Sequence, residues 1–447
     1  MRRVVITGVG AVCPLGLTST DFWKGLLDMR SGVAALSAFD PAAFPSRVAG
    51  QVPTFKTVEF VPKSYRKATK IMARDIELAV VAADGAVRDA HLATRGVLET
   101  FGGKKPDNSW LDVDPRRIGC NIGAGLICAD LNELTAAMAA ARTDDGGLDL
   151  HKWGRSDDPS KPSGMDRLTP LWLLKYLPNM LACHVSIIHD TQGPSNTITC
   201  QQASAGLALA EACRTIQRGQ ADIALVGGCE SMVHPMGLMR WTLLNRLTTS
   251  GNDQPAQACR PMDQAASGTV IGEGGSVLII EALEHALARG GQIYAEVAGL
   301  GASSSGRGIA GTDPTGEAMS MAMRKSLADA TINATDVQLV IPCGYGIAAH
   351  DQAEAAALHR VFGAHRPEVL PIRGGLGDAG AGSQALDLAA AALALRHQAI
   401  PGAVNCPHPI AELQVSRQTH DAVIDHVLVS TGSIAGQNSA VLLSRYR

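Results

Sequence analysis

The stretch that most constrains the fold of this chain spans residues 196–228, where two short apolar segments enclose a helical pattern. The first segment ends in a tight turn at residues 200–202. From Ser204 onward, apolar residues recur at helical spacing as far as Gly219, a residue typical of a helix end. A compact apolar strand at 223–226 follows. This order predicts a strand, a turn, a helix and a buried strand, with the turn at the positive end of the helix, where a thiol is biased towards thiolate.

The segment resembles the nucleophile region of the β-ketoacyl-acyl-carrier-protein synthases, in the thiolase superfamily. Members of that family carry a reactive cysteine at the turn, a helix that ends in glycine and a strand that ends in Gly-Gly. Counting back from Gly219 and Gly227 places the nucleophile position at Gln202, and Cys200 lies two residues before it. An amide side chain has no ionisable nucleophile and cannot hold an acyl thioester. The resemblance therefore predicts that the covalent step is lost.

The resemblance covers essentially the whole chain and implies an α/β, thiolase-like fold with five layers (αβαβα), built from two duplicated halves. We expect an N-terminal half with the nucleophile turn over residues 1–258 and a C-terminal half over residues 259–447. The residue pattern also favours a second α/β half. Its helices are expected near 317–330, 351–362 and 383–397, between strands near 337–341, 368–372, 426–430 and 439–444.

Two further catalytic positions are implied by the resemblance, because the family supplies two histidines that polarise a malonyl thioester. The loop that normally opens with the first histidine begins here with Cys343, ahead of Asp351. Counting back along the helix that follows places Asp378 at the second histidine position. Gly432 falls at the position of a gating phenylalanine, so we expect no bulky gate. All three catalytic positions have thus changed.

Cys343 is the residue best placed to rescue nucleophilic chemistry, because it should face the old pocket. We expect Asp378 beside it to raise the pKa of its thiol, which opposes reaction near neutral pH. His350 is expected on the surface, and Asp351 with Glu354 is expected to open the next helix as a capping box. An independent nucleophile is therefore not expected.

Two groups of residues have both a plain and a functional interpretation. Apolar residues at helical spacing after residue 122 are typical of core packing, but family members place this region at the dimer interface beside the acyl tunnel. These residues are Ile127, Leu131, Leu134 and Met138. A basic run at 62–75 is typical of a solvated helix face, but family members carry basic residues there that meet the acidic acyl carrier protein. These residues are Lys63, Arg66, Lys67 and Lys70.

Composition excludes several other classes of protein. The 447 residues are 46% hydrophobic and 18% charged, which favours a tightly packed α/β protein, and the net charge of −3 gives no support for a nucleic-acid partner. No apolar run is long enough to cross a bilayer and no leader sequence is evident, so we expect a cytoplasmic protein with no membrane contact. The ten cysteines lack the spacing of a metal site or a disulfide framework. In the polar loop at 143–166, His151, Asp157 and Asp158 are expected to be solvated charge rather than metal ligands.

The changed triad favours a ketosynthase-like partner subunit, similar to the chain length factors of type II polyketide systems. Such a subunit pairs with an active ketosynthase and shapes the acyl tunnel, while an acyl carrier protein delivers the chain as a thioester on its phosphopantetheine. No other cofactor is expected. Two alternatives remain open: a malonyl-carrier-protein decarboxylase of the kind that has glutamine at this turn, and an autonomous acyltransferase that uses Cys343. A homodimer is also compatible with the sequence.

Overall fold

A computed structural model of the chain describes residues 1–156, 158, 160–308 and 312–447. Its largest sheet has ten strands in the order β10-β9-β13-β14-β8-β1-β7-β6-β4-β5. Five of these strands come first in the chain: β1 (Val4–Val12), β4 (Ile118–Ala124), β5 (Ser195–Ile198), β6 (Ile223–Ser231) and β7 (Glu273–Ala282). Five come later: β8 (Ala295–Ser304), β9 (Leu339–Ile341), β10 (Glu368–Val369), β13 (His426–Gly432) and β14 (Gln437–Ser444).

The two sets of five strands repeat one topology. In the first set β1 is antiparallel to β7 and β7 to β6, and β6, β4 and β5 follow in parallel. In the second set β8, β14, β13, β9 and β10 repeat these antiparallel and parallel pairings in the same order. This repeat confirms the two duplicated halves. The boundary between residues 258 and 259 stays a prediction, and β7, which lies beyond it, pairs with strands of the first set.

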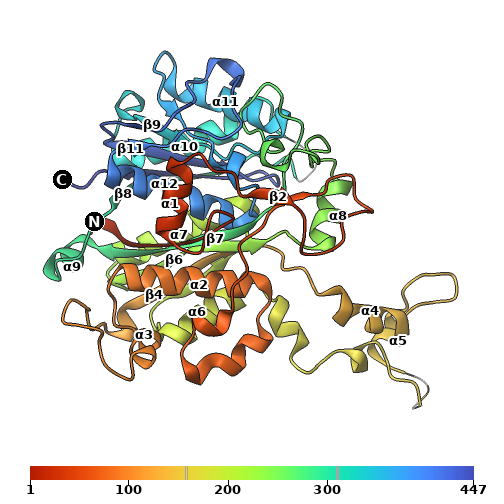
Figure 1. The fold of residues 1–447 in the computed structure, drawn as a ribbon. Helices are drawn as coiled ribbons and strands as arrows, with labels where there is room; N and C mark the ends of the chain where they lie inside the picture. The colour runs from red at the N-terminus through yellow and green to blue at the C-terminus, as the bar shows by residue number, and fades with distance from the viewer. Residues whose placement is uncertain (157, 159, 309–311) are drawn as a thin grey trace.

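Helices form three layers around the strands (Figure 1). The helices of these layers are α2 (Arg74–Asp89), α6 (Met180–His189), α7 (Ser204–Gln217), α10 (Glu317–Ala330), α11 (Ala348–Phe362) and α12 (Ser383–His397). The central helices α7 and α12 contact each other and strands of both sets. Outside the first set lie α2 and α6, and outside the second lies α10 with α11 beside it. This is the five-layered αβαβα arrangement that the resemblance implied.

Burial on all sides explains the composition of α12. Every residue from Ser383 to Leu395 is buried. A helix enclosed in this way needs no polar face, so alanine and leucine occupy most of its length. It also approaches α7 closely, because a Cβ added to Gly206 of α7 would lie 2.4 Å from Oε1 of Gln384. None of the helices in the described ranges is both long and apolar enough to span a bilayer.

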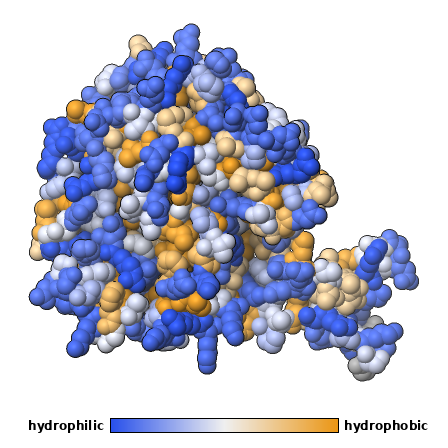
Figure 2. Space-filling view, viewed as in Figure 1, coloured by the Kyte–Doolittle hydropathy of each residue, from blue (hydrophilic) through white to orange (hydrophobic). Residues whose placement is uncertain are grey.

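A helical arm stands away from the layered body (Figure 1). It carries α4 (Leu131–Ala140) and α5 (Leu150–Gly154), and Figure 2 shows apolar side chains where the arm leaves the body. Ile127 precedes α4 and is buried, whereas Leu131 and Met138 on the helix are 40% and 41% exposed. The interpretation as core is therefore wrong for Leu131 and Met138, which stay exposed although α5 contacts the same helix.

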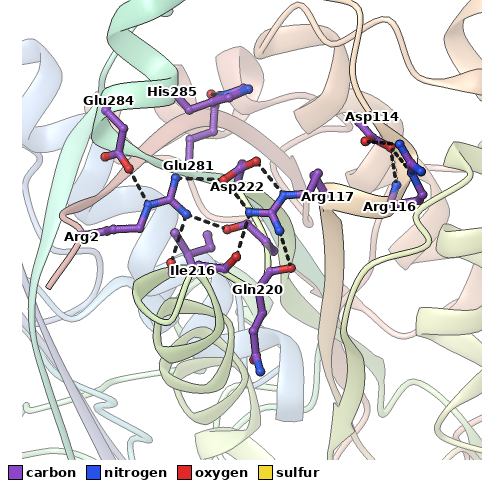
Figure 3. A network of polar contacts seen from close by, with 12 residues as sticks. Arg2, Asp114, Arg116, Arg117, Ile216, Gln220, Asp222, Glu281, Glu284 and His285 are labelled. Atoms are coloured by element: carbon purple, nitrogen blue, oxygen red, sulfur yellow. Dashed lines mark hydrogen bonds and ion pairs between the residues drawn. The ribbon is translucent and has the colours of Figure 1, made fainter.

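An ion network joins the strand ends of the first half (Figure 3). Arg2 lies before β1, Arg117 before β4 and Asp222 before β6. The carboxylate of Asp222 pairs with Arg2 at 2.9 Å and with Arg117 at 2.8 Å, and Arg2 also pairs with Glu284 of α9 (Leu283–Ala288). Hydrogen bonds from Arg117 and Arg2 lower the pKa of Asp222 to about 2. The network thus joins the starts of β1, β6 and β4, of which β6 and β4 are adjacent and β1 is separated from β6 by β7.

Candidate functional site

The predicted nucleophile turn forms where the sequence indicates it. A 3-10 turn, η6 (Gln201–Ala203), leads from β5 into α7, and Gln202 is only 1% exposed there. The hydroxyl of Ser204 fastens the turn by accepting a hydrogen bond from the N–H of Cys200 at 2.8 Å. Gln201 has a φ of 51°, in the left-handed region that residues other than glycine seldom adopt. A sharp turn therefore presents Gln202 at the positive end of α7.

Gln202 and Asp378, which lie 176 residues apart, are in direct contact. Nε2 of Gln202 donates to Oδ2 of Asp378 at 2.8 Å, and both side chains are buried. Oδ1 of Asp378 accepts from the N–H of Gly380 at 3.0 Å and from the hydroxyl of Ser383 at 2.8 Å. Three donors converge on this side chain, which satisfies the acceptors of a carboxylate. Two of the three positions that the resemblance predicts for the triad thus form a hydrogen-bonded pair with no ionisable nucleophile.

The third position, Cys343, is directed to a buried glutamate. Its thiol donates to Oε2 of Glu354 at 3.0 Å, and the N–H groups of Cys343 and Gly344 donate to the same carboxylate at 3.0 Å. Burial and the charge of Glu354 raise the pKa of the Cys343 thiol well above its ordinary value. The expected direction of the shift is correct, but the carboxylate responsible is Glu354 rather than Asp378. A thiol held in this way is not a nucleophile near neutral pH.

The expected capping box at Asp351 and Glu354 is wrong. Asp351 accepts from the N–H of Tyr345 at 2.8 Å, of Gly346 at 3.0 Å and of Met262 at 2.8 Å. Ile347, the N-cap residue of α11, makes no side-chain capping hydrogen bond, and the helix begins at Ala348. Both carboxylates turn back and hold the loop at 343–346, because that loop has buried N–H groups with no strand to receive them.

His350 is buried rather than on the surface, with 3% of its area exposed. Its ring packs edge-on against Tyr345, with 5.6 Å between ring centroids. Burial lowers the pKa of His350 to about 4, so the ring is neutral at physiological pH. The prediction of a surface position is wrong. A histidine next to a helix start is usually exposed, but here the loop that carries Tyr345 packs over the ring.

A buried ion pair behind this loop was not found from the sequence. Nη2 of Arg373 pairs with Asp387 of α12 at 3.0 Å, and both side chains are at most 2% exposed. Nη1 of Arg373 also donates to the carbonyl oxygens of Pro342 and Cys343. The available signal was an aspartate within an otherwise apolar helix, since an isolated charge there requires a partner. This pair fixes the loop that carries Cys343 against α12.

A cavity of about 100 Å³ lies beside Gln202. Its walls include Glu230 of β6 and the apolar side chain of Ile434. Gly432, the predicted gate position, does not line this cavity; its carbonyl accepts from the hydroxyl of Tyr345 at 2.7 Å. Gly432 therefore does not leave this cavity, which we call the chamber, open, because Ile434 supplies a bulky wall two residues further on.

Glu230 is a second buried carboxyl group that the sequence did not reveal as part of the site. It is 7% exposed and accepts from the N–H of Ala381 at 2.7 Å. Gly125 and Gly380 make room for it, since a Cβ on either would lie 2.0 Å from a carboxylate oxygen of Glu230. Burial, followed by the charges of Asp75 and Asp378, raises the pKa of Glu230 to about 8. This group is therefore mostly protonated at pH 7.

Two surfaces that the resemblance singled out lie apart from the chamber. The four basic residues Lys63, Arg66, Lys67 and Lys70 are exposed on η2 (Lys63–Ile71). None of the four forms an ion pair with any residue that the structure describes. On the arm, Leu131, Leu134 and Met138 line a groove of about 510 Å³, which Ile127 does not reach. The tunnel, interface and carrier-protein roles of these residues stay predictions.

The described ranges contain no candidate metal site. No group of three or more histidine, cysteine, aspartate or glutamate side chains there is arranged to hold a metal ion. Of the imagined set in the polar loop, Asp157 lies outside the described residues. The ten cysteines are all free thiols. The residues that line the chamber supply hydrogen-bonding groups and apolar walls, and the described lining includes neither a cysteine nor a histidine.

Comparison with known proteins agrees with this architecture. The family models for the beta-ketoacyl synthase N-terminal and C-terminal domains match residues 1–286 and 294–407. The chain is 30% identical to 3-oxoacyl-[acyl-carrier-protein] synthase 2 of Rhizobium meliloti (strain 1021), over 100% of this chain and 99% of that protein. It is also 30% identical to a putative polyketide beta-ketoacyl synthase 1 of Streptomyces halstedii, over 99% of this chain and 98% of that protein. Among solved structures, the ishigamide ketosynthase/chain length factor has a TM-score of 0.81 at 25% identity, with 100% of both chains covered.

Proposed function

The chain belongs to the β-ketoacyl synthase family, and we propose that within it the protein is a partner subunit of the chain-length-factor type. In this role it pairs with an active ketosynthase and shapes the acyl tunnel of the pair during polyketide or fatty-acid-like chain elongation. The hydrogen bond from Gln202 to Asp378 carries the proposal. The bond joins an amide and a carboxylate, and by resemblance these two residues correspond to the cysteine and one histidine of the family. Because an amide does not attack a thioester, another subunit must hold the growing chain.

The two alternative functions receive less support from the geometry. An autonomous acyltransferase needs a thiolate at Cys343, but burial and Glu354 raise the pKa of that thiol well above its ordinary value. Decarboxylases with glutamine at the turn retain both histidines of the family, whereas Cys343 and Asp378 occupy those positions here. Proton transfer and polarisation of a malonyl thioester therefore lack the groups that this chemistry uses.

The exposed apolar face of the arm supports a protein partner. Leu131, Leu134 and Met138 of α4 gather on one groove, together with Met236 of α8 (Pro235–Leu243). A cluster of exposed apolar side chains is typical of a protein interface. A structural relative of this chain, the ishigamide ketosynthase/chain length factor, combines the two kinds of subunit by name. We assign the groove to the contact with the active ketosynthase.

The basic face of η2 supports an acidic carrier protein as the second partner. Lys63, Arg66, Lys67 and Lys70 are exposed, and none of them forms an ion pair with a residue that the structure describes. Clustered charges of one sign steer a partner of opposite charge and make its binding sensitive to salt. A sequence relative named 3-oxoacyl-[acyl-carrier-protein] synthase 2 is consistent with such a partner.

Reconstitution tests this function directly. The purified chain alone is expected to take up no acyl group from acyl carrier protein and to condense no malonyl units. Addition of a synthase with its cysteine and both histidines intact is expected to give condensation, with a product length that changes when this chain is left out. Robust condensation by this chain alone would overturn the proposal, and carbon dioxide release without condensation would favour the decarboxylase instead.

A matched pair of variants tests the proposed interface. Met138→Glu places a charge on the groove of α4, and Met321→Glu places the same charge on α10, where the methionine is similarly exposed, at 43% against 41%. We expect Met138→Glu to abolish co-purification with the ketosynthase, because burial of a carboxylate in an apolar contact is costly. Met321→Glu should co-purify normally. Equal behaviour of the two variants would place the interface elsewhere.

A further inference from the structure

We propose that a second cavity, at the base of the helical arm, binds a small primary ammonium ion with a short alkyl chain. The cavity lies between the arm, the start of α2 and the end of β6, and its lining residues differ from those of the chamber. This inference goes beyond the proposed function, since it concerns a ligand of this chain alone. Binding needs no partner subunit and no covalent step.

Asp75, the second residue of α2, is the group that points to a ligand. Its side chain lines the cavity and is only 3% exposed. Oδ1 accepts from the N–H of Ser231 at 3.2 Å, whereas Oδ2 accepts no hydrogen bond from any residue that the structure describes. Oδ2 is nevertheless not among the polar atoms that the protein encloses without a partner, so it faces the cavity. A carboxylate oxygen in such a place requires a donor, because buried polar groups are nearly always hydrogen-bonded.

The two cations in the cavity wall are already matched by carboxylates. Arg74 donates from Nε and Nη2 to both carboxylate oxygens of Glu273, at 3.0 and 2.8 Å. Lys175 donates to Oε1 of Glu133, a carboxylate that also lines the cavity. These two pairs therefore leave neither cation free to neutralise the remaining acids of the wall.

Asp75 and Asp130 are the lining acids that remain, and neither forms an ion pair with a described residue. Oδ1 of Asp130 caps α4 by accepting from the N–H of Asn132 at 2.7 Å, and no described donor reaches its Oδ2. His234 also lines the cavity but does not balance these acids, because burial lowers the pKa of its ring. The wall therefore offers two carboxylates to a ligand of positive charge.

A primary alkylammonium ion complements these walls in charge and in size. It carries one positive charge and three N–H donors without an acceptor, which suits carboxylate oxygens. Met72 and Val233 supply apolar parts of the wall against which an alkyl chain packs. The volume of about 220 Å³ corresponds to roughly seven water molecules, so an amine with a short alkyl chain fits. Pentylamine is a suitable probe, and with so few atoms we expect a dissociation constant in the millimolar range.

Ligand-observed NMR on the purified full-length chain at pH 8 tests the inference. Saturation-transfer titrations are expected to show binding of pentylamine, and at least tenfold weaker binding of pentan-1-ol and of pentanoate. The three probes have alkyl chains of similar length, but the alcohol is uncharged and pentanoate is negative. Equal binding of the amine and the alcohol, or no pentylamine signal at tens of millimolar, would overturn the proposal.

Two variants of α2 locate the bound probe. Asp75→Asn removes the charge while keeping an acceptor for the N–H of Ser231, and we expect pentylamine to bind at least fivefold more weakly with unchanged circular dichroism. Asp84→Asn is the matched control, because Asp84 is a buried aspartate of the same helix, 8% exposed, that does not line the cavity. It should bind the probe as the natural chain does. Undiminished binding by Asp75→Asn, or an equal loss in both variants, would refute the site.

The pH dependence of binding gives a readout that a merely structural role of Asp75 would not change. Burial raises the pKa of Asp75 to about 7, whereas an alkylamine, with a pKa of about 10, stays protonated in this range. Below pH 7 the probe must displace a proton from Asp75, so its affinity should fall about tenfold from pH 8 to pH 6. The other groups that act on this carboxylate are Arg74 of α2, Glu273 of β7, Cys229 and Glu230 of β6, and Cys128 after β4. The same titration of Asp75→Asn accounts for them and should change less than twofold; an equal fall in both proteins would overturn the assignment to Asp75.

Discussion

The turns that open α7 and α12 share one backbone but differ in their chemistry. In each turn the hydroxyl of the first helical serine accepts from the N–H four residues earlier, at 2.8 Å for Ser204 and 2.9 Å for Ser383. The residue three positions before each serine is left-handed, with φ of 51° at Gln201 and 53° at Gly380. The duplication has therefore preserved the shape of the turn in both halves, whatever side chain it carries.

The two turns differ in what anchors them. Counting from the serines, Asp387 of α12 corresponds to Ala208 of α7. Asp387 pairs with Arg373, so a buried ion pair fixes the C-terminal turn, whereas the helix after the N-terminal turn packs there through an alanine. The bond from Gln202 to Asp378 then ties the N-terminal turn to the anchored one. The chamber keeps its form because one half supports the other.

Removal of the anchor should have the largest effect. Arg373→Met leaves Asp387 buried without a counter-charge, so we expect the free energy of unfolding to fall by about 3–5 kcal/mol. Urea denaturation followed by circular dichroism measures this loss. The double variant Arg373→Met/Asp387→Leu should regain much of it, because an apolar pair needs no partner. A loss below about 1 kcal/mol for the single variant would mean that the anchor is not what distinguishes the two turns.

Glu230 lies between the two turns and should give a pH-dependent effect of the next size. Its folded-state pKa of about 8 lies above the ordinary value of about 4.3, so its protonated form stabilises the fold. That contribution is complete below the unfolded-state pKa and is lost as pH rises through the folded-state pKa. Glu230→Gln keeps the acceptor for Ala381 but cannot ionise. Relative to the natural chain it should therefore gain stability between pH 5 and pH 8.5, by at most about 1.4 kcal/mol per pH unit.

Unfolding free energies of both proteins at pH 5 and pH 8.5 provide the measurement. The difference between them removes the contribution of other buried acids, such as Asp75, whose pKa burial raises to about 7. If the two stability profiles run parallel, Glu230 titrates normally and the contact between the turns does not depend on its proton.

Restoring a thiol at the turn should not by itself restore a nucleophile. In Gln202→Cys the sulfur lies at the positive end of α7, but the carboxylate of Asp378 opposes its ionisation. We expect slow alkylation by iodoacetamide at pH 7, and an increase of about tenfold when Asp378→Asn is added, because removal of a neighbouring negative charge lowers a thiol pKa by about one unit or more. The pH profile of the alkylation rate gives both pKa values. Equal profiles would show that the two turns are not coupled electrostatically.

Sequence periodicity predicted the elements well and the contacts between them poorly. The helices at 317–330 and 383–397 follow from local pattern, and the turn at Gln202 follows from the spacing of glycines. By contrast, Asp351 and Glu354 have the spacing of a capping box, yet their partners are N–H groups in the loop before the helix. Local spacing is compatible with both arrangements, and only tertiary packing decides between them.

The same limit applies to the groups that define the chamber. Arg373 and Asp387 come from different elements, and Glu230 is part of the site only because β6 lies beside the turn before α12. No short-range pattern links these residues. The sequence correctly indicated that the cavity wall lies near the end of β13, at Gly432. The wall residue is Ile434, two positions further on, and nothing in the local composition distinguishes these two positions.

The smallest loss of stability is expected at the starts of β6 and β13, where the two halves differ in their ion pairs. Asp222 before β6 pairs with two arginines, whereas Asp425 before β13 pairs with one arginine among the described residues, Arg447, at 2.7 Å. Both sites are partly exposed, so we expect Asp222→Asn to cost about 1 kcal/mol at pH 7 and Asp425→Asn about half as much. Since its arginines lower the pKa of Asp222 to about 2, the cost should be present above pH 4 and should shrink as pH falls from 4 towards 2. Thermal unfolding at pH 7 and pH 3 compares the two variants; equal losses at pH 7 would show that the extra arginine adds nothing to the first half.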